Sequence, residues 1–200
     1  MTLRIFFTLA AAALLIPAPA RAADAGASAT AQSLCDALLA SMKKGSALDF
    51  KGREALLAPE VQKDLDLAFM ARIVVGPPWR SLSADDQRQL TQAFSDYSVA
   101  TYAQEFASYS KDRFEVDPTP AAMGGNTLVH TKFFPGGGDP VQLDYLMRQE
   151  ASGWKIIDVY LNGSISQMAA RRSEYSTTLR QGGASALIAL LKKKTADLGG

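Results

Sequence analysis

The stretch GWKIIDVYLNGSISQMAARRSEY, residues 153–175, joins a strand to a helix, and it is the clearest guide to the fold. Residues 154–161 are almost entirely apolar and rich in aromatic and β-branched side chains, which is typical of a buried strand. Asn162-Gly163 ends this strand, and Ser164 is placed to cap the helix that follows. The strand therefore packs in the interior, and the helix folds back from its end.

One carboxylate, Asp158, lies in the middle of this apolar strand. A buried carboxylate is costly unless hydrogen-bond donors or a cation offset the loss of water. We expect Asp158 to be structural and to accept hydrogen bonds from backbone amides or from a cation. Arg80 is the first candidate for that cation and Arg72 the second, because the segments that carry them are expected to pack near the sheet. The alternative is an Asp158 that faces water.

Helical spacing dominates the chain before residue 110. Leu34, Leu38 and Met42 recur every four residues, which indicates an amphipathic helix. The small residues 23–30 that precede it are expected to be frayed. Four helices are predicted in this half: residues 31–44, a helix opened by Pro59, residues 66–75 before Gly76 and Pro77-Pro78, and a helix capped by Ser83 that runs to about Tyr109.

A period of two residues replaces the helical spacing after residue 110. Strands are predicted at residues 113–117, 127–134, 141–148 and 154–161. Helices return at residues 164–180 and 184–198, on either side of Gly182-Gly183. Helices, then an antiparallel meander, then helices predict an α+β fold, with helices packed on a curved antiparallel sheet of about four to five strands.

Residues 1–22 have the organisation of a secretory signal peptide. Arg4 supplies the positive charge, residues 5–16 form an apolar run too short to span a membrane, and Ala20-Arg21-Ala22 is a small-x-small cleavage site. We therefore expect residues 23–200 to form one exported domain without a membrane span. Cys35 is the only cysteine, which excludes an internal disulfide and favours a buried, inert thiol.

The charge of the chain argues against a nucleic-acid partner. The formal net charge is +1, and it becomes −1 once Arg4 and Arg21 leave with the signal peptide, with 19 basic against 20 acidic side chains remaining. Basic residues nevertheless gather late in the chain, at Arg171, Arg172 and Arg180. They indicate either solvated helix faces or a docking surface for an acidic partner or anionic headgroups.

Catalytic chemistry is poorly supported by the residues. The one histidine, His130, lies in a predicted strand, whereas a metal site needs several ligands and a Ser triad needs a positioned base. Gly-x-Ser-x-Gly is absent, and residues 136–138, three glycines, precede a strand rather than the helix N-terminus that a phosphate loop uses. We therefore expect no enzyme, no cofactor and no metal.

The apolar and aromatic side chains suggest a ligand cavity instead. Rows of them on one strand, on its neighbour and on the facing helices either interlock as core or enclose an apolar hollow. The residues expected to line that hollow are Val141, Leu143, Tyr145 and Met147 on one strand, Trp154 and Ile156 on the next, and Phe69, Ile73, Phe94, Tyr97 and Tyr102 on the helices.

Three segments resemble the MlaC family of periplasmic proteins, also described as toluene-tolerance or auxiliary-transport proteins. They are DLAFMARIVVGPPWRSLSADDQRQLTQAF at residues 66–94, VATYAQEFASYS at residues 99–110, and GWKIIDVYLNGSISQMAARRSEYSTTLRQGGASALIALL at residues 153–191. The sequences of residues 158–166 and 171–175 are most similar to those of the hopanoid-biosynthesis-associated branch, HpnM. The sequence departs from the family pattern at Asn162, where an acidic residue is common, and at Pro77-Pro78 before Trp79.

The resemblance implies a periplasmic carrier that shuttles phospholipid, or a hopanoid-related lipid, between an inner-membrane ABC-type transporter and an outer-membrane complex. An acyl chain of about 15 methylenes loses on the order of 12 kcal/mol in water, so it needs an enclosed pocket of roughly 300–1,000 Å3. Two alternatives stay open. A small-molecule-binding or lyase-type enzyme would place a charged group of shifted pKa in the pocket, and an adaptor would have a filled core.

Overall fold

The computed structural model describes residues 20–200, and of residues 20–25 and 46 it describes the backbone only. The predicted signal peptide therefore lies largely outside the described residues. The helices are α1 (Ala20–Lys44), α2 (Phe50–Asp64), α3 (Leu67–Val75), α4 (Ala84–Glu105) and α5 (Gln167–Gly199), with short 3-10 turns η1 (Gly45–Ala47) and η2 (Pro77–Ser81). Gly183 has a non-helical backbone inside α5, so the helix is kinked at the predicted break.

Seven strands form one antiparallel sheet, more than the four to five predicted. They are β1 (Arg113–Val116), β2 (Ala121–Met123), β3 (Asn126–Val129), β4 (Thr131–Phe134), β5 (Val141–Glu150), β6 (Gly153–Leu161) and β7 (Ile165–Ser166). Both β4 and β3 pair with one edge of β5, and they carry β1 and β2 on their outer sides. The other edge of β5 pairs with β6, which pairs with β7.

The predicted strand at residues 127–134 is divided at His130 into β3 and β4. The carboxylate of Asp144, on the neighbouring β5, causes the break. It accepts a hydrogen bond from the Thr131 amide at 3.2 Å and lies 3.0 Å from Nδ1 of His130. A side chain thus replaces a strand carbonyl as the partner of this amide, and the ladder is interrupted there.

A β-bulge in β6 sets which side chains share a face with β5. Leu146 pairs with Asp158 but Met147 pairs with Ile156, so Ile157 is the extra residue. Beyond the bulge, Val159 and Leu161 lie opposite Tyr145 and Leu143. The face that carries Ile156 before the bulge therefore continues with Val159 rather than with Asp158.

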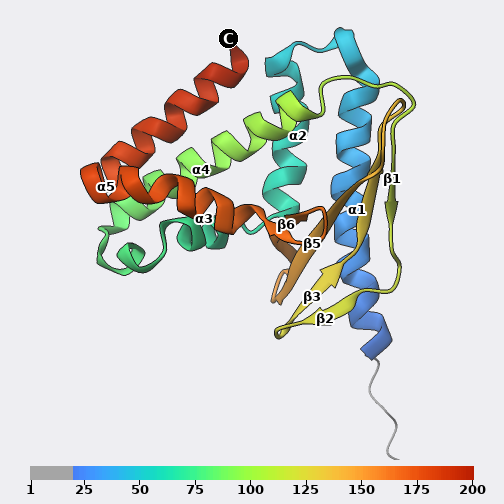
Figure 1. The fold of residues 1–200 in the computed structure, drawn as a ribbon, viewed down its shortest axis with the longest axis horizontal. Helices are drawn as coiled ribbons and strands as arrows, with labels where there is room; N and C mark the ends of the chain where they lie inside the picture. Colours follow the sequence, from blue (N-terminus) through green and yellow to red (C-terminus); the bar gives the residue numbers. More distant parts are fainter. Residues whose placement is uncertain (1–19) are drawn as a thin grey trace, which may run out of the picture.

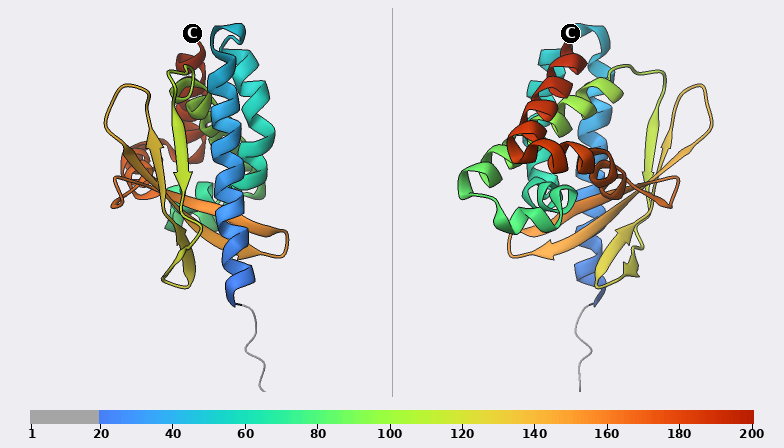
Figure 2. Two further views of the ribbon diagram at one scale, coloured as in Figure 1. Left: turned by 90° about the vertical axis from the view of Figure 1, so that its right-hand side faces the viewer. Right: turned by 60° about the vertical axis from the view of Figure 1, so that its left-hand side comes forward.

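The helices and the sheet enclose the core between them (Figure 1). Helix α1 runs beside the sheet in each view, and α3, α4 and α5 gather away from the strands β1 to β3 (Figure 2). Residues from α1, α2, α3, α4, α5 and the sheet all contribute to one hydrophobic cluster. Among the described residues, no helix has the length and hydrophobicity that crossing a bilayer requires.

Two predictions about the N-terminal helices were wrong. Residues 23–30 are helical within α1 rather than frayed, because Ala27 is fully buried and Gly26 lies against Trp154. A Cβ at Gly26 would lie 2.7 Å from Cδ1 of Trp154, so only glycine permits this approach. Pro59 lies inside α2 instead of opening it, and Asp49 caps that helix by accepting a hydrogen bond from the Gly52 amide.

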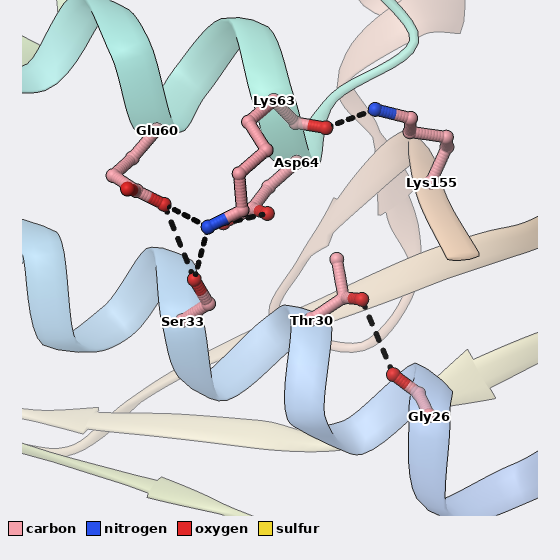
Figure 3. Close-up of polar contacts among 7 residues, drawn as sticks. All are labelled: Gly26, Thr30, Ser33, Glu60, Lys63, Asp64 and Lys155. Carbon is pink, nitrogen blue, oxygen red and sulfur yellow. Dashed lines mark hydrogen bonds and ion pairs between the residues drawn. The ribbon is translucent and has the colours of Figure 1, made fainter. Parts of the chain in front are cut away.

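A polar cluster fastens α1 and α2 to the beginning of β6 (Figure 3). Lys63 Nζ donates to Glu60 at 2.5 Å and to Ser33 at 3.2 Å, and Lys155 donates to the Lys63 carbonyl. Burial raises the pKa of the Asp64 carboxyl, while the charge of Lys63 beside it opposes that rise. The Oδ2 atom of Asp64 has no hydrogen-bond partner in the described part of the chain. The cluster closes the end of the core where β6 begins.

Asp158 joins β6 to the start of α5. It is 7% exposed, and its carboxylate accepts hydrogen bonds from the Ser166 hydroxyl at 2.5 Å and from the Met168 amide at 3.1 Å. Ser166 in turn caps α5 by accepting from the Ala169 amide, so the negative charge lies at a helix N-terminus. Backbone amides were predicted as partners, but the predicted cation is replaced by a hydroxyl: neither Arg80 nor Arg72 bonds to Asp158. The predicted cap, Ser164, precedes the true one.

Replacing Asp158 by alanine removes this junction. We expect Asp158→Ala to lower the free energy of unfolding by about 2–3 kcal/mol, since the Met168 amide and the Ser166 hydroxyl lose a charged acceptor. For a domain of this size that corresponds to a fall of roughly 5–10 °C in melting temperature. Thermal unfolding followed by circular dichroism measures it, with the exposed Asp139→Ala as the matched control. Equal melting temperatures for the two variants would disprove the structural role.

Cys35 should be chemically silent in the folded protein. Its side chain is buried on α1, and desolvation raises the pKa of the thiol to about 12, although the Tyr145 hydroxyl lies 4.0 Å away. The thiolate is the reactive form, so an aromatic disulfide reagent at pH 8 should label Cys35 only after denaturation. Rapid labelling of the native protein would show that the core around α1 opens.

Candidate functional site

An apolar cavity of about 190 Å3 lies between the helices and the sheet. One wall is the β5–β6 face set by the bulge, and the other consists of α4, the first turns of α5, Met70 of α3 and Leu65. The residues that line it are Leu65, Met70, Ser98, Thr101, Tyr102, Glu105, Phe106, Leu143, Tyr145, Val159, Leu161, Gln167, Met168 and Arg171. Most of these side chains are apolar, so the cavity suits a hydrocarbon group better than a polar metabolite.

Two tyrosines supply polar groups inside the cavity. Tyr145 is 1% exposed, and its hydroxyl lies 4.0 Å from Cys35 Sγ. Burial raises the pKa of Tyr145 well above its usual value and raises that of Tyr102 too. Both hydroxyls therefore stay protonated and neutral, so these two residues add no charge to the cavity lining.

The charged residues of the cavity are Arg171 and Glu105. Arg171 is half-buried; it donates to the Tyr175 hydroxyl at 3.3 Å and lies 4.9 Å from the centre of the Tyr97 ring. Glu105, the last residue of α4, borders the cavity and is exposed to solvent. Partial burial raises the pKa of the Glu105 carboxyl, and the charge of Arg171 opposes that rise.

Three of the eleven residues predicted to contact a ligand line this cavity: Leu143, Tyr145 and Tyr102. Phe94, Met147 and Ile156 belong to the close-packed core. Trp154 packs on Gly26 of α1, and Val141 pairs with Phe133 at the opposite end of the β5 face. Phe69 contacts the guanidinium groups of Arg72 and Arg148 through its ring. Arg171 lies over the ring of Tyr97, and Ile73 lines a separate groove.

The predicted residues of β5 share one face of the strand, but only part of that face borders the cavity. Leu143 and Tyr145 border the cavity, whereas Met147, two residues further on, is fully buried opposite Ile156. Helices α1 and α2 contact the sheet and share one hydrophobic cluster with Met147 and Ile156. Core and cavity therefore divide the same face of β5.

Several cavity residues were not predicted. Val159 and Leu161 were missed because the bulge at Ile157 changes the alternation of β6. Gln167, Met168 and Arg171 follow the strand-to-helix junction, and Arg171 had been grouped with a docking surface. Met168 and Arg171 are three residues apart on one helix face, and this spacing was the only available signal.

Four arginines surround a separate surface groove, the arginine groove. Two adjoining hollows of about 580 and 220 Å3 share Pro77 and Arg172, and Arg72, Arg80 and Arg180 border them. The same groove presents apolar atoms of Trp79, Ile73 and Leu179. In the described part of the chain, none of the four arginines forms an ion pair. Two of the predicted docking residues, Arg172 and Arg180, therefore lie together, and Arg171 lies in the cavity instead.

His130 lies in a hydrogen-bond network around Asp144. His130 contacts Asp144, but that carboxylate also accepts hydrogen bonds from the Thr131 amide and from Gln142, at 2.7 Å for the latter. Among the side chains that the structure describes, from residue 26 onward, no three of His, Cys, Asp or Glu are arranged to hold a metal ion. The His130–Asp144 contact is therefore part of the network at the break between β3 and β4.

Comparison with known proteins agrees with this architecture. The fold resembles that of a phospholipid-binding protein from Ralstonia solanacearum, solved in complex with a phospholipid, with a TM-score of 0.76 and 23% identity over 88% of this chain and 100% of the other. Among curated proteins, none matches this chain. The model of the MlaC protein family matches residues 32–193. Because that match covers most of the sequence, the chain belongs to the MlaC family.

Proposed function

We propose that this protein is a non-enzymatic lipid carrier. It holds an acyl chain of the lipid in the cavity between α4, α5 and the β5–β6 face. The observation that carries the proposal is the apolar cavity itself, in a chain of the MlaC family whose fold resembles that of a phospholipid-binding protein. Neutral tyrosine hydroxyls and apolar side chains line its interior, which favours methylene groups over water.

The size of the cavity indicates that binding requires expansion. Its volume of about 190 Å3 is smaller than the 300–1,000 Å3 that the sequence led us to expect. An acyl chain would therefore have to move the helical wall away from the sheet. Each methylene removed from water contributes about 0.8 kcal/mol toward that rearrangement.

Leu143→Arg tests whether the cavity holds the lipid. Leu143 borders the cavity, so an arginine there can extend toward the open side while its charge stays hydrated. We expect a folded variant that retains less than about a tenth of the lipid found in the wild-type protein, because each tenfold loss needs only about 1.4 kcal/mol. Organic extraction followed by mass spectrometry measures the lipid, and circular dichroism verifies folding.

The matched control is Leu56→Arg, at an exposed position of α2 outside the cavity, which should retain its lipid. A folded Leu143→Arg protein with a full complement of lipid would place the ligand elsewhere. An unfolded one, or a wild-type protein without extractable lipid, would favour a filled core and an adaptor role.

We further propose that the protein works in the periplasm and exchanges lipid between an inner-membrane ABC-type transporter and an outer-membrane complex. Family membership and the predicted signal peptide support this location. The cargo in this proposal could instead be a hopanoid-related lipid. Only the sequence resemblance to the HpnM branch supports that cargo. The arginine groove is the surface best suited to an acidic partner or to anionic headgroups, since none of its four guanidinium groups forms an ion pair with a described side chain.

Reversing two charges in the groove should slow lipid delivery. We expect Arg172→Glu/Arg180→Glu to reduce the transfer rate to vesicles rich in anionic lipid roughly tenfold at low ionic strength, and the difference should shrink at high salt. Transfer of a fluorescent phospholipid measures the rate. Arg88→Glu/Arg113→Glu introduces the same charge change at two exposed sites elsewhere and should have little effect. Equal slowing by both double variants would assign the effect to net charge alone.

A further inference from the structure

The cavity contains one cation and one anion that are not paired with each other. Arg171 extends from α5 and Glu105 ends α4, and both border the same apolar space. Within residues 26–200, neither side chain forms an ion pair at 4.0 Å or less. An acyl chain needs neither charge, so this arrangement requires another explanation.

The Arg171 side chain is held in place, and some of its N–H donors remain available. Its guanidinium donates to Tyr175, whose side chain is fully buried, and lies over the ring of Tyr97. Guanidinium has five N–H donors in one plane, and two of them can bind two oxygens of a phosphate at once. Because both aromatic partners fix the side chain, little conformational entropy is lost when an anion binds.

Glu105 offers the opposite charge on the open side of the same space. It is exposed enough to be reached from solvent, and its carboxyl feels the positive charge of Arg171. A carboxylate binds a primary ammonium group through charge-assisted hydrogen bonds. A ligand with a phosphate and an amine a few bonds apart would therefore match both residues, whereas a ligand with a phosphate alone would bring a second negative charge near Glu105.

We propose that Arg171 and Glu105 form a headgroup site that selects zwitterionic, amine-bearing phospholipids, with Arg171 binding the phosphate and Glu105 the ammonium group. This inference rests on the proposed lipid-carrying function and adds to it the chemical class of the cargo. It also distinguishes a phospholipid from a neutral polycyclic lipid, which would leave both charges without a partner.

Competition between two lipids tests the headgroup site. Delipidated protein is incubated with vesicles of equal phosphatidylethanolamine and phosphatidylglycerol, and the bound lipids are measured by mass spectrometry. The wild-type protein should bind mostly phosphatidylethanolamine. Glu105→Gln should lower the ratio of the two lipids roughly tenfold, the effect of one charge-assisted hydrogen bond. Glu105→Lys should reverse the preference, and a lysine is well tolerated at a helix C-terminus.

Variants of Arg171 test the phosphate contact. Arg171→Gln should reduce the binding of both phospholipids, and Arg171→Lys should restore part of it because the positive charge returns without the planar fork. Glu115→Gln, an exposed position on β1 outside the cavity, is the control that should preserve the wild-type ratio.

The outcomes separate the two levels of the proposal. A wild-type protein that takes up both lipids equally, or a Glu105→Gln variant with an unchanged ratio, would overturn the headgroup assignment and leave lipid binding intact. A wild-type protein that takes up neither lipid would overturn the phospholipid-carrying function together with the headgroup site.

Discussion

The hydrogen bonds of Asp158 are the constraint on which the candidate site depends. This carboxylate binds the Ser166 hydroxyl and the Met168 amide, and so fixes the first turn of α5 against the end of β6. The cavity residues Gln167, Met168 and Arg171 follow directly from that turn. A charge that is costly to bury is thus stabilised by the N-terminus of a helix, and in return it positions one wall of the cavity.

The bulge at Ile157 gives the opposite wall its composition. Without the extra residue, Asp158 would continue the face of Ile156 and point at the cavity side of the sheet. With it, Val159 and Leu161 take that face, and Asp158 is free to reach the helix. The apolar wall and the polar junction therefore have a common origin in one inserted residue.

Much of the fold could be predicted from local patterns. The α+β order, the capping of α4 by Ser83, the end of α3 at Gly76 and the buried face of β5 all follow from spacing and turn chemistry. The candidate site could be predicted only in part, because it depends on long-range packing. Met147 and Leu143 have the same pattern in the sequence, yet one lies in the core and the other borders the cavity. Arg171 and Arg172 are neighbours that face different hollows, which a count of late basic residues cannot reveal.

The most direct measurement of where the lipid binds is an isotope-filtered NMR experiment on the protein loaded with a phospholipid that carries 13C-labelled acyl chains. Nuclear Overhauser effects should connect the acyl methylenes to the methyl groups of Leu143, Val159, Leu161 and Met168. These four residues come from β5, β6 and α5, and all four line the cavity. Contacts confined to Ile73 and Leu179 of the arginine groove, or no contacts at all, would contradict the account.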